Sequence, residues 1–353
     1  MNIDNTDTQS LSKLYRSFIW KRILLLASFL LVLMLALIVN IMAGPAGLNL
    51  SEIWSGLTAT NVTENYHALI MWEIRLPYVV MAMLVGACLG LAGAEMQTVL
   101  NNPLASPSTL GVMYGATLGA SLAIVYKIGI GYLPENYILP ICAFLGAMIT
   151  VLLIQFLSAK FGATIDTVIL FGIAMVFALQ ALTALIQFVA DSDNLQQIVF
   201  WTMGSLARAN WEKNAIVLVI LLGCIPFTIR HLWQMTALRA GEEYAKSYGL
   251  SVERLRLMVL FRVSIVTAAA VSFTGIIGFV GLVAPHISRM AFGEDHRFYI
   301  PGSIIAGAFI LVGASILSKT LVPGILIPDG IVTALIGIPL FLFLLIRQKG
   351  AHS

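Results

Sequence analysis

The sequence predicts an all-α polytopic membrane protein with about ten transmembrane helices, one of them short and broken. Apolar residues make up 59% of the 353 residues and charged residues only 10%, against roughly 25% charged in an ordinary soluble domain. The mean hydropathy is +0.94, and a soluble core of this size cannot hide so much apolar surface behind so few charges. Secreted disulfide scaffolds and cytosolic enzymes are therefore excluded. The net charge of +3 is too small to indicate a nucleic-acid partner, so the expected surroundings are a lipid bilayer.

The first apolar run, Ile23–Ala43, follows a polar tail that ends on four Lys and Arg residues. About 20 apolar residues are enough to span a hydrocarbon core of about 30 Å. The run lacks a small-x-small cleavage site followed by a polar mature domain, so it is not a signal peptide. We expect a first transmembrane helix, with residues 1–22 as a cytoplasmic tail.

Nine further apolar segments follow along the chain. The segment Leu282–Phe292 is too short to cross alone, follows a glycine-rich stretch and carries Pro285. We expect it to be a half-helix inside the bundle, because broken helices at membrane depth must lie against protein or a water-filled path. The remaining spans are Pro77–Gln97, Leu110–Tyr126, Ile138–Leu157, Thr167–Val189, Asn214–Ile229, Met258–Ile276, Tyr299–Ser318 and Ile331–Ile346.

The distribution of basic residues predicts the orientation. Ten spans with a cytoplasmic N-terminus place the C-terminal tail, residues 348–353, in the cytoplasm as well. Fifteen of the 20 Lys and Arg residues then fall on the cytoplasmic side, as the positive-inside rule requires. The five on the other side are Arg75, Lys127, Arg208, Lys213 and Lys319.

The sequence lacks the residues that several other mechanisms need. It contains no Gly-Lys dipeptide, hence no phosphate-binding loop, and no HExxH, CxxC or GxSxG motif. Membrane-embedded acids are scarce apart from Glu95, whereas ion-driven carriers usually need buried carboxylates or histidines. We therefore expect no catalysis, cofactor or metal in this chain, and a separate ATPase as the energy source. The three cysteines, Cys88, Cys142 and Cys224, have no metal-binding spacing.

Three stretches carry a resemblance to a known family. They are Arg75-Leu-Pro followed by residues 86–116, then LRAGEEYAKSYGLSVERLR from Leu238 to Arg256, and GIIGFVGLVAPHISRMAFGEDHRFYIPGS from Gly275 with DGIVTALIGIPLFLFLL after it. In this order and spacing they resemble the iron–siderophore and vitamin B12 permease family of ABC importers (FecCD-like). The resemblance covers roughly residues 20 to 347.

The resemblance implies a type II ABC importer permease, with residues 23–347 as one transmembrane domain in the bacterial inner membrane. It further implies a second permease subunit, identical or paralogous, two cytoplasmic ATPase subunits and a periplasmic siderophore-binding protein. The expected cargo is a ferric siderophore, because this is the commonest use of the family. Haem and vitamin B12 are the alternatives within the same architecture, and an ion-coupled secondary transporter is the rival class.

The cytoplasmic stretch 230–257 is the predicted docking and coupling loop for the ATPase. Apolar residues recur at helix-like spacing among charged ones, and Gly241 and Gly249 bracket them, which suits a short amphipathic helix pair inserted into a groove of a partner. The alternative is a positive-inside loop without a partner. The resemblance favours coupling and points to Leu238, Gly241, Glu242, Ala245 and Gly249.

The stretch Asn101–Pro107 is predicted to be a tight reversal, because two prolines and an Asn pair cannot continue a helix. The resemblance implies that Asn102 and Leu104, with Pro103 between them, help to close the transport path on the cytoplasmic side. The two interpretations are compatible, since a stiff turn from each of two subunits can meet at a two-fold axis.

Arg75 and Lys319 are the predicted docking residues for the binding protein at the external mouth. The alternative for Arg75 is an arginine that snorkels to lipid headgroups. The sequence departs from the family pattern twice: Tyr78 stands where a second arginine is usual, and Leu326 stands where a glutamate is usual before the last span, with Asp329 just after Pro328. The sequence offers no physical reason for the second change.

Histidines and charged residues near the inner surface leave alternatives open. His286 follows Pro285, and a structural role is favoured there over a haem ligand. Arg289, Asp295, His296 and Arg297 either touch the ATPase or lie in water.

Overall fold

The computed structural model describes residues 5–44, 49–59, 65–128 and 134–350, which are mostly helical and contain no strand. Each of the ten predicted spans corresponds to a helix, so the predicted fold class is confirmed. These helices are α1 (Asn5–Met42), α4 (Leu76–Val99), α5 (Val112–Tyr126), α6 (Glu135–Lys160), α7 (Ile165–Val189), α9 (Trp211–Arg239), α11 (Val252–Thr274), α12 (Val280–Phe292), α13 (His296–Thr320) and α14 (Asp329–Gly350).

Short elements connect these helices: α2 (Leu50–Thr58), α3 (Tyr66–Leu69), α8 (Ser192–Thr202), α10 (Glu242–Ser247), a π-helical turn η1 (Ile70–Arg75), and the 3₁₀ turns η2 (Pro107–Leu110) and η3 (Leu206–Arg208). Within the described residues, seven helices are long and apolar enough to cross a membrane, and α5 and α14 are shorter apolar helices. The half-helix α12 has 13 residues, too few to span alone.

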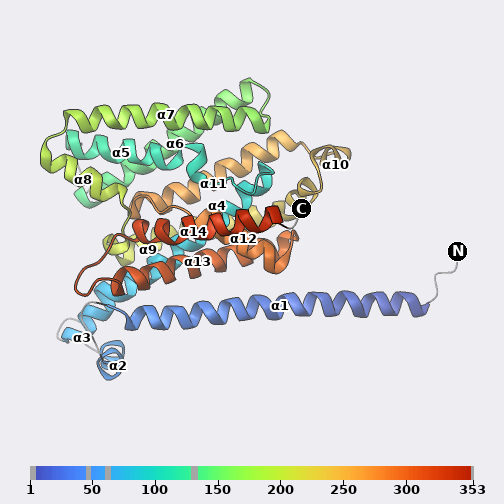
Figure 1. Ribbon diagram of the computed structural model, residues 1–353, viewed down its shortest axis with the longest axis horizontal. Helices are drawn as coiled ribbons and strands as arrows, with labels where there is room; N and C mark the ends of the chain where they lie inside the picture. The colour runs from blue at the N-terminus through green and yellow to red at the C-terminus, as the bar shows by residue number, and fades with distance from the viewer. Residues whose placement is uncertain (1–4, 45–48, 60–64, 129–133, 351–353) are drawn as a thin grey trace.

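Helix α4 lies at the centre of the bundle. In the apolar part of the continuous helical segment Tyr66–Val99, which contains α4, 83% of the residues are buried. In the apolar part of α1, which lies at the edge of the bundle (Figure 1), only 11% are buried. Helix α4 packs against α13 and α12 on one side and against α11 and α9 on another, while α5, α6 and α7 form a separate layer. The helix that bears Arg75 and the turn 101–107 at its two ends is therefore also the helix around which the others pack.

Small residues explain the close approach of α4 and α13. A Cβ atom added at Gly90 would lie 2.2 Å from the carbonyl oxygen of Ser303, and one added at Gly307 would lie 2.2 Å from that of Gly86. Since real Cβ atoms do not approach so closely, glycine is required where the two backbones touch. The GxxxG spacing of Gly86 and Gly90 thus serves helix packing.

The predicted break before the half-helix is present. Helix α11 ends at Thr274, residues 275–278 are not helical, and α12 begins at Val280 after Phe279 in a left-handed conformation (φ 65°). Gly275, at φ 77°, faces the carbonyl oxygen of Trp201, which a Cβ atom there would meet at 2.1 Å. The break is thus buried against α8, as irregular backbone at membrane depth requires.

Several helix ends differ from the prediction. Helix α9 continues to Arg239 and α11 begins at Val252, so the predicted loop 230–257 consists largely of two helix extensions with α10 between them. The reason is local, since no glycine or proline interrupts residues 227–240. Before α4, the helical chain already begins at Tyr66 and passes through the π turn η1, which inserts an extra residue into the helical path.

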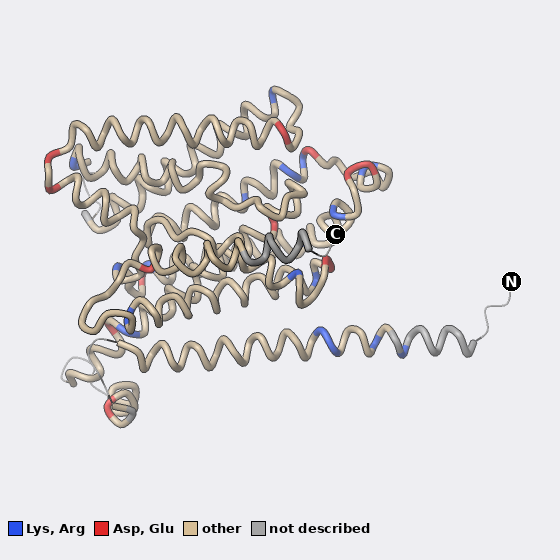
Figure 2. Tube along the Cα trace, viewed as in Figure 1, with Lys and Arg blue, Asp and Glu red and all other residues tan. Residues whose placement is uncertain are grey.

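Charged residues gather at the two ends of the bundle, and the middle of the long helices is almost free of them (Figure 2). One end, here called the α10 end, holds α10, the start of α1 and the end of α14; the other, the α2 end, holds α2, α3 and η1. This separation fits a bundle whose middle lies in hydrocarbon.

Candidate functional site

The turn that follows α4 at the α10 end is a tight reversal. Asn101 has a left-handed backbone (φ 43°). The Asn102 side-chain oxygen accepts a 2.9 Å hydrogen bond from the Leu104 amide, and the Asn102 carbonyl accepts one of 3.1 Å from the Ala105 amide. These bonds leave the Leu104 side chain 42% exposed beyond Pro103. A stiff turn that presents an apolar side chain is what a gate formed by two copies would need.

Helix α10 is the short helix predicted from the coupling motif, and glycines frame it. Gly241 caps it at φ 136° and Gly249 ends its turn at φ 77°, both conformations that favour glycine. Leu238 and Ala245 are buried inside the chain, with Ala245 fully buried. Ala245 therefore packs α10 against its own chain.

The exposed face of α10 carries aromatic side chains. Tyr244 and Tyr248 are 51% and 56% exposed, and their rings lie 4.9 Å apart. The Tyr248 ring lies 6.3 Å from that of Trp233 on α9, edge to face. Together these three side chains help to line a hollow of about 300 Å³ between α9 and α10. An exposed aromatic cluster of this kind is typical of the centre of a protein interface.

Glu242 joins α10 to two cations. Its carboxylate lies 3.1 Å from Nζ of Lys246 and 3.0 Å from Nη2 of Arg256. Partial burial raises the pKa of Glu242, but the hydrogen bonds and charges of Lys246 and Arg256 outweigh it and hold the pKa below its ordinary value. Glu242 is therefore ionised at neutral pH and anchors α10 to α11.

Arg256, in the second turn of α11, is 1% exposed. Its guanidinium donates from Nε to the carbonyl oxygen of Val99 (3.1 Å), from Nη1 to that of Ala163 (2.7 Å) and from Nη2 to Glu242 (3.0 Å). In the sequence, Arg256 is one of the cytoplasmic cations. In the structure, it joins its own helix α11 to α4, to the turn after α6 and to α10.

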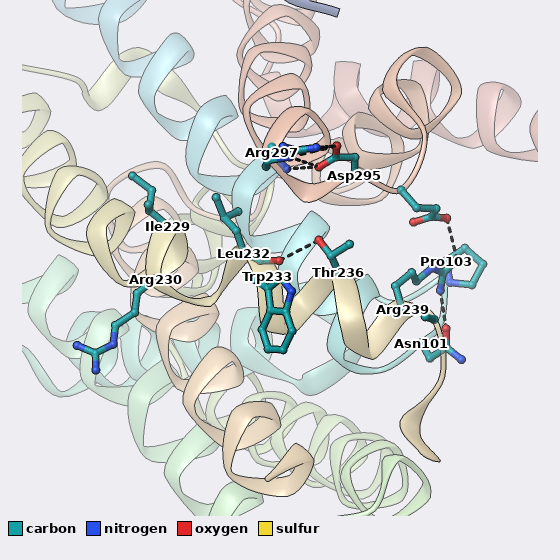
Figure 3. A pocket seen from close by; sticks show the side chains of 12 residues that line it. Asn101, Pro103, Ile229, Arg230, Leu232, Trp233, Thr236, Arg239, Asp295 and Arg297 are labelled. Carbon is teal, nitrogen blue, oxygen red and sulfur yellow. Dashed lines mark hydrogen bonds and ion pairs between the residues drawn. The ribbon is translucent and has the colours of Figure 1, made fainter. Parts of the chain in front are cut away.

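A second arginine lies beside the turn 101–107, in a cavity of about 1190 Å³ at the α10 end (Figure 3). Arg239, the last residue of α9, donates from Nη1 to the side-chain oxygen of Asn101 (2.5 Å) and from Nη2 to Glu294 (3.1 Å). Glu294 also pairs with Nε of Arg289 at 3.0 Å. The turn after α4 is thus tied to the end of α9 and to the α12–α13 turn.

His296 is buried, so in this structure it neither lies in water nor faces the ATPase. It is 0% exposed, and its ring nitrogens lie 2.9 Å from Thr98 Oγ1 and 3.1 Å from Thr236 Oγ1. It therefore joins α4, α9 and α13 inside the bundle. Asp295 and Arg297 pair with each other at 2.7 Å at the same end.

The two predicted docking cations at the α2 end are also buried. Arg75 is 6% exposed and donates from Nη1 to the carbonyl oxygens of Ile41 (2.8 Å) and Met42 (3.3 Å) at the end of α1. Lys319 is 8% exposed and donates to the side-chain oxygen of Asn40 at 2.6 Å. Both cations thus hold the end of α1 to the bundle. Their docking role stays a prediction.

Tyr78 and Asp329 meet each other beside Lys319. The Tyr78 hydroxyl donates to Oδ1 of Asp329 at 2.7 Å, and the Leu206 amide donates to Oδ2 at 2.8 Å. Nζ of Lys319 lies 4.3 Å from the centroid of the Tyr78 ring. Asp329, the first residue of α14, therefore lies in a buried polar cluster that also includes α4, α13 and η3.

Glu95 is paired within the bundle. Arg262 of α11 donates to its carboxylate from Nη2 at 2.6 Å and from Nε at 2.9 Å, and the Thr228 hydroxyl donates at 2.7 Å. Arg262 lies within the predicted span Met258–Ile276 but was counted among the cytoplasmic cations, and it is 6% exposed because it packs against Glu95 of α4. The pair joins α4, α9 and α11.

Within the described ranges, no three His, Cys, Asp or Glu side chains come close enough together to hold a metal ion. The residues that the sequence analysis missed are arginines inside the quoted motifs, Arg239 and Arg256, together with Arg262 and the Tyr78–Asp329 contact. An arginine near a helix end fits the positive-inside rule whether it is exposed or buried. A single sequence carries no signal for its partners.

The comparisons with known proteins agree with the motifs. The model of the FecCD transport family matches residues 31–347. An iron chelatin transport system permease protein of Helicobacter pylori (strain J99) is 38% identical over 80% of this chain and 84% of its own length. A hemin transport system permease protein of Yersinia pestis is 34% identical over 93% and 97%. A solved metal-chelate type ABC transporter in an inward-facing conformation superposes with a TM-score of 0.81 at 30% identity, over 92% of this chain and 99% of that one.

Proposed function

This chain belongs to the FecCD transport family and is an ABC importer permease, and on this premise we propose that its cargo is a ferric siderophore. The iron chelatin permease of Helicobacter pylori and the metal-chelate type of the structural neighbour support a chelated metal. The hemin permease of Yersinia pestis supports haem as the second candidate, and vitamin B12 is the third.

In the proposed assembly, two permease subunits, identical or paralogous, sit above two cytoplasmic ATPase subunits and receive cargo from a periplasmic binding protein. The observation that carries this arrangement is the placement of α10 beside the turn 101–107, here called the gate turn. Arg239, just before α10, bonds to Asn101 of that turn. Tyr244 and Tyr248 of α10 and Leu104 of the gate turn are exposed. ATP-driven closure of the ATPases pushes on α10, and the path then opens alternately to each side by rocking of the helices.

The Glu95–Arg262 pair supports an ATP-driven importer over an ion-coupled carrier. A coupling ion or proton needs a carboxylate that can change its partner or its protonation during the cycle. Glu95 is instead held by three donors from α9 and α11. A carboxylate fixed in this way serves the packing of the bundle.

The proposed location is the bacterial inner membrane with both termini in the cytoplasm. The start of α1, the end of α14 and α10 lie at one end of the bundle, which supports a shared side. Reporter fusions after Ser353 and within residues 61–66 should report cytoplasm and periplasm, respectively. A periplasmic C-terminus would overturn the orientation.

Uptake by reconstituted transporter tests the cargo. The chain is reconstituted with its cognate ATPase and binding protein, and uptake is measured for a panel of ferric siderophores, hemin and cobalamin. We expect ATP-dependent uptake of a ferric siderophore alone. Uptake of hemin or cobalamin instead would overturn the cargo, and uptake driven by an ion gradient without the ATPase would overturn the transporter class.

A further inference from the structure

We propose that Arg256 and Glu242 form the link that transmits movement of α10 to the gate turn, with Arg239 and Asn101 as a second link. This proposal rests on the proposed function, because it assigns a route between the ATPase-facing helix and the gate. It concerns positioning residues that contact neither cargo nor nucleotide.

The first step is the reach of Arg256. Its side chain begins on α11, yet one buried guanidinium holds Glu242 of α10 and the carbonyl oxygen of Val99, the last residue of α4. Val99 lies three residues before Asn102, whose amide bonds to the Gln97 carbonyl at 3.1 Å. The path from α10 to the gate turn therefore consists of one side chain and a few residues of backbone.

The second step is the cost of breaking this contact. A buried guanidinium that loses an acceptor keeps the cost of desolvation, which is larger for charged groups than for neutral ones. Arg256 is 1% exposed, so the bonds to Val99 and Ala163 are shielded from water. The Glu242 side chain is 37% exposed, so water can replace that partner more easily. We therefore expect the end of α4 to follow α11, and α10 to be the weaker and adjustable member of the link.

The third step is the second arginine, Arg239, which lies in the chain segment before α10, whereas Arg256 lies in the segment after it. Arg239 lies three residues before Glu242 and bonds to the side chain of Asn101, next to the gate residue Asn102. The segment before α10 thus bonds to the turn after α4 through Arg239 (Figure 3), and the segment after α10 bonds to the last residue of α4 through Arg256. A displacement of α10 in either direction pulls on that turn through an arginine.

The reporter for the test is a cysteine at the exposed gate position. Leu104→Cys is introduced after Cys88, Cys142 and Cys224 have been replaced by alanine, and its modification rate by a maleimide is measured in the reconstituted complex with and without ATP and vanadate. In this parent chain we expect nucleotide to change the rate by about fivefold or more, the lower end of typical coupling between sites. A parent that shows no response while uptake is intact overturns the gate assignment of the proposed function, separately from the link.

Glu242→Gln is the main variant, because it removes the charge but keeps the shape at a partly exposed site. The matched control is Glu243→Gln, the exposed neighbour on the same helix. We expect the nucleotide response of Leu104→Cys to fall toward onefold in Glu242→Gln and to be unchanged in Glu243→Gln, while the ATPase still copurifies and hydrolyses ATP. An unchanged response in Glu242→Gln overturns the link, and so does loss of the ATPase, since it would assign Glu242 to docking.

Arg256→Lys provides a second test, because lysine keeps the positive charge but cannot reach three acceptors in different directions. Arg254→Lys, at an exposed position on the same turn, is its matched control. In Arg256→Lys we expect ATP hydrolysis to continue while the modification rate of Leu104→Cys no longer changes with nucleotide. A purely structural residue would not give this uncoupled phenotype. If Arg256→Lys lowers stability but each assembled complex keeps the full nucleotide response of Leu104→Cys, Arg256 only supports the fold.

Discussion

Tyr78 and Asp329, 251 residues apart in the chain, share a 2.7 Å hydrogen bond at the α2 end of the bundle. Tyr78 is one of the two positions at which the sequence departs from its family pattern, and Asp329 lies three residues after the other, Leu326. The carboxylate of Asp329 needs donors once it is buried, and the Tyr78 hydroxyl is one of them. Tyr78 and Asp329 therefore form one unit.

Removal of the Tyr78 hydroxyl should destabilise the protein. Tyr78→Phe keeps the ring near Lys319 but leaves Oδ1 of Asp329 without that donor, and a hydrogen bond to a charged group contributes about 1.5–3 kcal/mol. We expect a loss of this size in the free energy of unfolding, measured by denaturant titration in detergent micelles. Tyr114→Phe on α5 is the matched control, because Tyr114 takes no part in the cluster.

The Tyr78→Arg change, which the family pattern alone would suggest is tolerated, has a different expectation. It would place a guanidinium beside Lys319, whose Nζ lies 4.3 Å from the Tyr78 ring centroid, within a buried cluster. We expect Tyr78→Arg to be at least as destabilising as Tyr78→Phe. Equal stability of Tyr78→Arg and the wild type would show that the cluster repacks freely.

Much of the fold could be predicted from the sequence because hydropathy acts locally. Ten apolar runs gave ten helices, and the glycine-rich stretch before Pro285 gave the break between α11 and α12. Helix ends were less predictable: α9 and α11 run past the ends of the predicted spans, since nothing in the sequence stops α9 before Gly241 or requires α11 to start as late as Met258.

The positions of the site's segments along the chain could be predicted from the sequence, but the burial of their side chains could not. The motif correctly located α10, and Asn102 does fold the reversal after α4. Burial of Ala245, Lys319 and Arg256 depends on residues distant in sequence, such as Asn40 for Lys319. Charge and apolarity along a chain do not report which helix covers a given side chain, so exposed and buried cations look alike in sequence.

The Glu95–Arg262 pair should behave as a buried pair. Breaking it by Glu95→Gln or Arg262→Met leaves one charged or polar group without its partner, and such changes typically cost about 3–5 kcal/mol. We expect each single variant to lose stability by roughly this amount. The double variant Glu95→Gln with Arg262→Met should lose clearly less than the sum, which a double-mutant cycle of unfolding free energies measures. Additive losses would show that the two side chains do not act as a pair.

Variants of α10 should separate its buried and exposed faces. Ala245→Leu adds volume where the structure has none to spare and should cost about 1–3 kcal/mol by overpacking. Tyr244→Ala removes an exposed ring and should leave stability almost unchanged while it weakens association with the ATPase. Copurification of the ATPase and thermal unfolding of the permease alone are the two measurements. Full ATPase binding by Tyr244→Ala would exclude its ring from the docking surface.

The anchoring of α10 by Glu242 should persist in mild acid. Because the pKa of Glu242 is lower in the folded protein, its contribution is fully present above the unfolded value of about 4.3. It is lost only as the pH falls through the lower folded value. Hydrogen-exchange protection of the α10 amides, corrected for the intrinsic rate, should therefore be constant from neutral pH to about 5 and fall below that range. Glu242→Gln should show weaker protection without this pH dependence.

The last prediction concerns Arg75, for which the sequence and the structure suggest different roles. If Arg75 docks the binding protein by an exposed charge, Arg75→Glu should slow association more than Arg75→Ala, and salt should reduce the difference. In the structure, Arg75 is instead 6% exposed, and its guanidinium is bound to the carbonyl oxygens of Ile41 and Met42.

We therefore expect Arg75→Ala to loosen α1 and lower stability by about 1–3 kcal/mol, with an association rate that depends on salt as in the wild type. Association rates of the binding protein with reconstituted wild type, Arg75→Ala and Arg75→Glu at two salt concentrations, together with unfolding of each variant, distinguish the roles. A salt-dependent loss of association at unchanged stability would show that Arg75 docks the binding protein after all.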